Sequence, residues 1–88
     1  MPSTNPDLAL ETAILHLLAE RGPGKTICPS EAARAVAASD SHAKWHPLMQ
    51  PARAAAHRLD AAGRIVVTQH GRRVDGATAK VPIRLKIR

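Results

Sequence analysis

The spacing of apolar residues changes at Gly63, and this change constrains the fold more than any other feature of the chain. Before Gly63, apolar residues recur every three or four positions, which is the period of one helix face. After it, apolar and polar residues alternate, most strictly over residues 81–88. Such alternation is typical of a strand with one buried face. We therefore expect helices first and a small sheet last.

Three helices are expected, at residues 6–21, 29–38 and 51–62. Each begins with a proline, whose missing N–H would have no helical partner at that position: Pro6, Pro29 and Pro51. Gly22 follows the first helix and Gly63 follows the third, where a left-handed residue commonly ends a helix. The segment between the second and third helices, residues 39–46, reads as a polar connection.

The core must be built from Leu, Ile, Val and Ala, because Phe and Tyr are absent and Trp45 is the only aromatic residue. The first helix presents an apolar stripe of Leu10, Ile14, Leu17 and Leu18. The stripes of the other two are rich in alanine: Ala32, Ala33, Val36 and Ala37, then Ala52, Ala55, Ala56, Leu59 and Ala62. Small side chains let helices approach closely, so a compact bundle is expected.

Two strands are expected in the last third, at residues 64–69 and 81–87, joined by a flexible loop at residues 70–80. Pro82 suits a sheet edge or the start of a strand. With a short extended piece at residues 25–28, the order of elements is that of a winged helix-turn-helix. The expected fold class is therefore α+β, with three helices followed by a two-stranded antiparallel wing. Residues 1–88 form one domain, in which residues 1–5 are expected to be disordered.

The chain is expected to be cytoplasmic. Its start has neither the positive charge nor the apolar run of a signal peptide. Its apolar stretches are far shorter than the roughly 20 residues that cross a bilayer, so no membrane is expected as a partner. Cys28 is the only cysteine, which excludes an internal disulfide and suits a reducing compartment.

The net charge of +6 lies entirely in the last third of the chain. Residues 1–63 carry equal numbers of cations and acids, whereas residues 64–88 carry seven cations against Asp75 alone. A locally concentrated positive charge favours a polyanionic partner, although it also serves simple solubility.

These cations suggest a nucleic-acid interface on the third helix and the wing. Arg53, His57 and Arg58 would lie in or beside the major groove, and Arg64, Arg72, Arg73 and Lys80 would contact phosphates. Ala54, Asp60 and Ala61 on the same helix leave few side chains that read bases, so contact is expected to be mainly electrostatic. In the alternative interpretation the cations are a solvated surface, and Arg84, Lys86 and Arg88 protect an edge strand from aggregation.

Other chemistry is not indicated by the sequence. The run at residues 22–26 lacks the glycine spacing of a phosphate loop. His42 and His46 have the spacing of metal ligands, but no third ligand is evident, and neither a metal nor another cofactor is expected. Cys28 is expected to be a buried apolar residue rather than a reactive thiol. No nucleophile and base are paired, so an enzyme is not expected.

Residues 19–34 contain the specific run Gly-Pro-Gly-Lys-Thr-Ile-Cys-Pro-Ser. Together with Trp45, Leu48-Met49, Arg53, residues 61–69 and residues 82–85, they resemble a small bacterial family of uncharacterised proteins, domain of unknown function 3253. The resemblance covers nearly the whole chain. It implies a winged-helix-like fold in a stand-alone protein, and it implies no activity, because the family has none assigned.

Two functions therefore remain open. The first is electrostatic binding of nucleic acid, most readily double-stranded DNA, because the chain lacks the aromatic platforms on which unpaired bases stack. The second is a protein-interaction or dimerisation module on the same scaffold, with the exposed alanines of the third helix as a flat docking face.

Overall fold

The computed structural model describes residues 6–74 and 83–88, and it confirms the α+β class. The main helices are α1 (Pro6–Arg21), α2 (Pro29–Ala37) and α4 (Met49–Ala61). Between α2 and α4 lie a short helix, α3 (His42–Trp45), and a 3₁₀ turn, η1 (His46–Leu48). The strands are β1 (Thr26–Ile27), β2 (Ile65–Gln69), β3 (Arg72–Arg73) and β4 (Arg84–Ile87).

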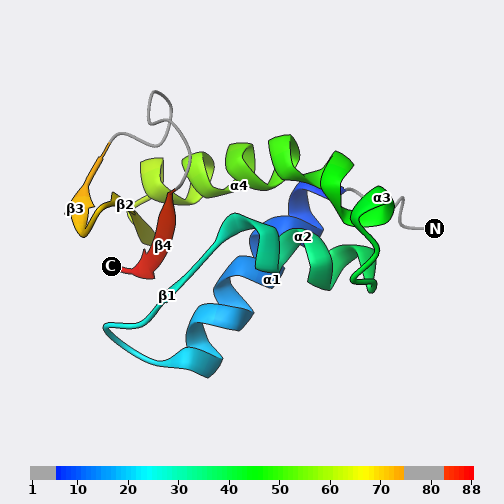
Figure 1. The fold of residues 1–88 in the computed structure, drawn as a ribbon. Coiled ribbons are helices and arrows are strands. Elements are labelled where there is room, and N and C mark those ends of the chain that lie inside the picture. Colours follow the sequence, from blue (N-terminus) through cyan, green and yellow to red (C-terminus); the bar gives the residue numbers. More distant parts are fainter. Residues whose placement is uncertain (1–5, 75–82) are drawn as a thin grey trace.

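The three main helices pack on one another, and the sheet lies at the C-terminal end of α4 (Figure 1). Short α3 lies at the opposite end of the molecule, beside the start of α4 (Figure 1). None of the helices in the described part of the chain is long and apolar enough to cross a membrane.

The core joins all three helices to the inner face of the sheet. Its buried aliphatic side chains include Leu10, Ile14, Leu18, Ile27, Leu59, Ile65, Val67, Ile83 and Leu85. The predicted alanines Ala32, Ala33, Ala52, Ala55 and Ala56 have no exposed surface at all. Alanine at these positions brings the helix axes together, as expected from the sequence. Leu17 and Val36 are only partly buried and pack at the margin of this core.

The sheet has four antiparallel strands in the order β1-β4-β2-β3. The prediction of a two-stranded wing was therefore wrong in strand number. Residues 26 and 27 pair with Lys86 and Leu85, so the short extended piece after α1 is a strand. Its two residues are too few to show an alternating pattern in the sequence.

Strand β4 is an interior strand, because β1 covers one side of it and β2 the other. The suggestion that Arg84, Lys86 and Arg88 protect a sheet edge was accordingly wrong. Pro82, which prompted the edge assignment, lies outside the described residues. Both strand predictions were slightly too long where they can be compared, since β2 begins at Ile65 and β4 begins at Arg84.

The predicted loop at residues 70–80 begins instead with a tight hairpin. Gln69 pairs with Arg72, and the two residues between them, His70 and Gly71, have φ angles of 53° and 80°. Two successive positive φ angles are typical of the type I′ turn, whose twist matches that of paired strands. The hairpin therefore holds Arg72 and Arg73 in a strand.

Helix α1 has the predicted bounds, whereas the ends of α2 and α4 differ from prediction by one or two residues. Helix α4 begins at Met49 rather than at Pro51, because the first N–H groups of a helix have no helical partner and proline is tolerated throughout that turn. Helix α2 ends at Ala37, since Ala38 adopts a left-handed conformation with φ 54°. The Ser39 N–H then donates to the Arg34 carbonyl, as in a Schellman cap.

Gly63 and Ala38 are matched sites for testing these caps. Gly63 has φ 76°, its neighbour Arg64 donates to the Leu59 carbonyl, and an added Cβ would meet no atom within 4 Å. We expect Gly63→Ala to lower the free energy of unfolding by about 1 kcal/mol, through backbone strain alone.

The substitution Ala38→Gly should raise the free energy of unfolding by up to about 1 kcal/mol, because glycine removes the same strain. Urea unfolding measures both; changes of the same sign would contradict this account.

Candidate nucleic-acid interface

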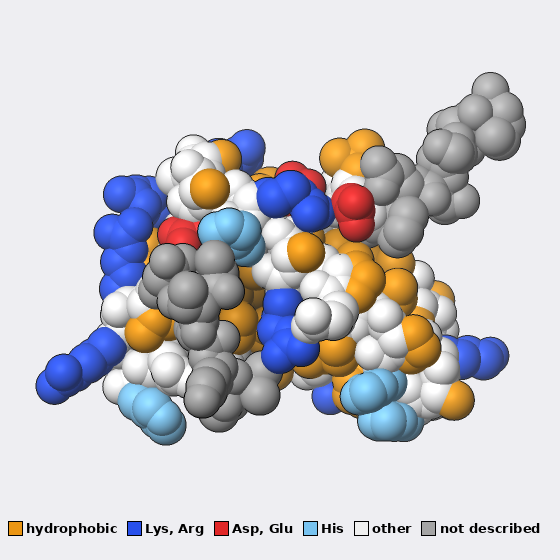
Figure 2. Space-filling model, turned by 90° about the horizontal axis from the view of Figure 1, so that it is seen from above, with side chains coloured by type: hydrophobic (Ala, Val, Ile, Leu, Met, Phe, Trp, Pro, Cys, Tyr) orange, Lys and Arg blue, Asp and Glu red, His pale blue; other side chains and the backbone are white. Residues whose placement is uncertain are grey.

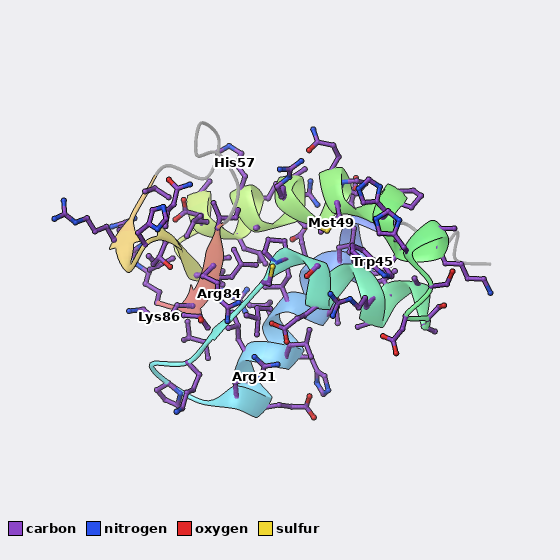
Figure 3. The ribbon with its side chains drawn as sticks, in the orientation of Figure 1. Arg21, Trp45, Met49, His57, Arg84 and Lys86 are labelled. Carbon is purple, nitrogen blue, oxygen red and sulfur yellow. The ribbon has the colours of Figure 1, made fainter. Side chains whose placement is uncertain are left out.

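The exposed side of α4 carries Gln50, Arg53 and His57. Gln50 and Arg53 are one helical turn apart, and the Arg53 guanidinium donates a hydrogen bond to the Gln50 side-chain oxygen. His57 is exposed and projects away from the other helices (Figure 3). Sequence reasoning missed Gln50, although its spacing from Arg53 places it on the same face and its amide can pair with adenine.

Arg58 occupies a different side of α4 and is engaged within the protein. Its Nε donates to Glu11 Oε2 over 2.8 Å, and its Nη2 lies 3.4 Å from the Asp7 carbonyl oxygen. Both side chains of the ion pair are partly buried. The structure therefore uses Arg58 to join α4 to α1, and its charge is balanced by Glu11.

The predicted wing residues gather near the C-terminal end of α4. Arg64, Arg72 and Arg73 are all exposed. Arg73 Nη2 lies 3.9 Å from Asp60 Oδ1, and the Asp60 side chain is only 14% exposed, so this acid faces the wing rather than solvent. Lys80 lies outside the described residues.

Figure 2 shows the face above α4 and the uneven distribution of charge on it. Lys and Arg side chains are grouped at the end of the molecule where β3 lies (Figures 1 and 2). Over the rest of this face they are dispersed among hydrophobic and uncharged groups (Figure 2). The end of the molecule at β3 therefore provides a stronger attraction for an anion than the body of α4.

Trp45 does not present a free aromatic face. The Arg34 guanidinium carbon lies 5.0 Å from the centroid of its ring, and the His42 ring meets it edge-on at 5.0 Å. His42 also stacks on His46, with ring centroids 4.3 Å apart. No third His, Cys, Asp or Glu among residues 6–74 and 83–88 completes a metal site with this pair. The group functions as packing at the junction of α2, α3 and η1.

A further set of cations lies on the outer face of the sheet, opposite the core. Its members on β4 are Arg84 and Lys86, and Arg88 continues the same alternation. Arg84 donates from Nε to the Thr26 hydroxyl oxygen at 3.0 Å and from Nη2 to the Thr26 carbonyl at 3.3 Å. Arg21, from the end of α1, donates to the same carbonyl at 3.1 Å. Two guanidinium groups from distant parts of the chain therefore meet at one residue.

Glu31 balances part of this charge and also caps α2. Its carboxylate accepts hydrogen bonds from the Arg21 guanidinium and, at 2.8 Å, from the Cys28 N–H. Burial raises the pKa of Glu31, but the Cys28 hydrogen bond, the hydrogen bond and charge of Arg21, and the charge of Arg84 outweigh it and lower the pKa below 4.5. Cys28 is half-buried rather than buried as predicted, because it lies where the chain leaves β1 and enters α2.

We expect Glu31→Gln to lower the free energy of unfolding by about 1–2 kcal/mol near neutral pH, because it removes an ion pair and weakens a helix cap. A carboxylate with a lowered pKa stabilises the fold above its unfolded-state pKa and loses that effect as the pH falls through its folded-state pKa. The difference between parent and variant should therefore shrink below pH 4.5. Urea unfolding over a pH series measures it; a difference that persists in acid would argue against this role.

The comparison with known proteins identifies a family without assigning an activity. A family model described as a protein of unknown function, DUF3253, matches residues 7–88. No curated protein matches the chain. The match spans α1 to the end of the sheet and so includes every element that positions the candidate interface. The chain belongs to the DUF3253 family of proteins of unknown function.

Proposed function

We propose that this protein is a small DNA-binding domain of winged helix-turn-helix type, which contacts duplex DNA through the exposed side of α4 and the basic β2–β3 wing. The order of elements supports the proposal: α2 is followed by the single turns α3 and η1 and then by α4, and a hairpin follows α4. In such proteins the last helix of the motif enters the major groove. Here that helix is α4.

The observation that carries the proposal is the division of charges. The acids Glu11, Glu31 and Asp60 of the helical part each lie against an arginine of the same molecule. Most exposed or half-buried cations without an acidic partner among residues 6–74 and 83–88 lie in or beside the sheet: Lys25, Arg64, Arg72, Arg84, Lys86 and Arg88. The others are Arg34, Lys44 and Arg53. An excess of unbalanced cations on one end of a small domain is the electrostatic feature that attracts a phosphate backbone.

Duplex DNA fits this surface better than an unpaired strand. Proteins that hold single strands stack the bases on aromatic side chains. The only aromatic residue of the chain is Trp45, and the side chains of Arg34 and His42 pack against its ring. Gln50 and Arg53 are the only long polar side chains at the start of α4, and they bond to each other, so base readout would be limited. Binding is therefore proposed to be mainly electrostatic.

Titration of a labelled generic duplex at salt concentrations from about 50 mM to about 200 mM tests the proposal. We expect Arg72→Gln/Arg73→Gln to weaken binding on the order of 10–100-fold at low salt and to reduce the slope of log affinity against log salt by about 2, one unit for each lost phosphate contact. Lys44→Glu, on α3 at the opposite end of the molecule, changes the net charge equally and is the matched control.

The parent protein must itself bind for the proposal to stand. No binding at the lowest salt concentration would reject DNA as the partner and favour the protein-interaction alternative. Equal losses in the wing variant and the Lys44→Glu control would show that net charge, rather than the wing, determines affinity.

A further inference from the structure

The outer face of the sheet carries several cations that no ion pair within the described residues balances. Strand β4 places Arg84 and Lys86 on this face, with Arg88 following in the same alternation. Cations are often placed on edge strands to prevent aggregation. That explanation does not apply, because β4 is paired on both sides.

The neighbours of these cations in the sheet do not neutralise them. Lys86 lies level with Thr26 on β1 and Val66 on β2, and Arg84 lies level with Thr68 on β2. An opposite charge directly across on the adjacent strand would stabilise a Lys or Arg at these positions. None of these three neighbours is acidic. Glu31, on which the charge of Arg84 acts, already bonds to Arg21 and to the Cys28 N–H.

Part of this surface is held in position before any ligand arrives. Thr26 accepts two hydrogen bonds from Arg84 and one from Arg21, so it orients both guanidinium groups. Side chains that are already ordered lose less conformational entropy on binding. Glu31 balances the charge of Arg21, so the oriented Arg84 guanidinium beside Lys86 is the part of this surface prepared for an anion.

The spacing along β4 suits a phosphate backbone. Alternate side chains of a strand are about 6.7 Å apart, because each residue advances about 3.4 Å. One strand of duplex DNA carries a phosphate about every 3.4 Å along the helix axis. Because the backbone winds around that axis, successive phosphates are farther apart than this rise, so cations about 6.7 Å apart have a spacing of the same order as the phosphates.

This surface is separate from the exposed side of α4. Arg21, Arg84 and Lys86 lie on the sheet and the end of α1, whereas His57 projects from the other side of the molecule (Figure 3). Arg64, directly before β2, lies across from the end of β4, since Ile65 pairs with Ile87. The surface therefore extends across the sheet toward the wing.

We propose that the outer sheet face, comprising Arg84, Lys86, Arg88 and Arg64 with Arg21 beside them, binds the phosphodiester backbone of duplex DNA. The contact is to phosphates alone, and it adds a binding surface to the α4 and wing contacts. The proposal rests on the proposed function, because it assigns a further surface for the same ligand.

The test compares Lys86→Gln/Arg88→Gln with Arg72→Gln/Arg73→Gln and Lys44→Glu, each of which lowers the net charge by two. Lys86 and Arg88 have no side-chain hydrogen bond to any other described residue, so their removal leaves the Arg84–Thr26 contacts intact. The duplex and salt series are those used for the wing. We expect Lys86→Gln/Arg88→Gln to weaken binding on the order of 10-fold or more and to reduce the salt slope by about 2. Lys44→Glu should do neither.

A second measurement needs no variant. Amide NMR signals of the parent protein are followed as the same duplex is added, and signals of β1 and β4 are expected to shift together with those of β3.

The two experiments together separate the outer sheet face from the proposed function. Shifts confined to α4 and β3, with Lys86→Gln/Arg88→Gln binding like Lys44→Glu, would overturn binding at the outer sheet face and leave the proposed function standing. Loss of binding in the sheet variant alone would support the sheet face and reject the wing. No binding by the parent protein would reject both.

Discussion

The pairing of β1 with β4 is the contact on which the rest of the structure depends. It joins residues 26 and 27 to residues 85 and 86, so it connects the end of the first helix to the last strand. On the inner side it buries Ile27 and Leu85 in the core. On the outer side it lets Thr26 accept hydrogen bonds from Arg84 and Arg21. One short strand therefore closes the core and organises the positive surface opposite it.

Electrostatics divides the molecule into two functional parts. In the helical part, ion pairs between Glu11 and Arg58 and between Glu31 and Arg21 link different elements, and these charges stabilise the fold. In the sheet, cations outnumber the acids that could balance them. The division follows from the sequence, where residues 1–63 are neutral and the remainder carries the whole net charge. Folding converts that linear asymmetry into a positively charged end of the molecule (Figures 1 and 2).

Local rules predicted the helices well and the sheet less well. Gly63 ends α4 in the expected left-handed conformation, and most alanines of the predicted stripes are buried, because both depend on neighbours within a turn or two. Ala62, directly after α4, is exposed, and Ala37 is only partly buried. Strand β1 was not recognised as a strand, because two residues form one only when a distant partner is present. Short α3 was also missed, since a single turn has too few residues for a detectable period. Among the site residues, Arg53, His57, Arg72 and Arg73 were predicted to be available and are exposed or half-buried, whereas Arg58 is held by Glu11.

By itself, the sequence determined which segments are helical, which faces are buried and where the net charge lies. These properties follow from the apolar period, from glycine and proline at helix ends, and from composition. Only the tertiary structure decided the order of the strands and which cations remain unbalanced. Strand order depends on pairing between distant segments, and the fate of each arginine depends on which acid lies within reach of it in space. Neither the pairing of distant strands nor the distance between an arginine and an acid can be inferred from neighbouring residues. The unbalanced cations on the outer face of the sheet could therefore be identified only in the folded protein.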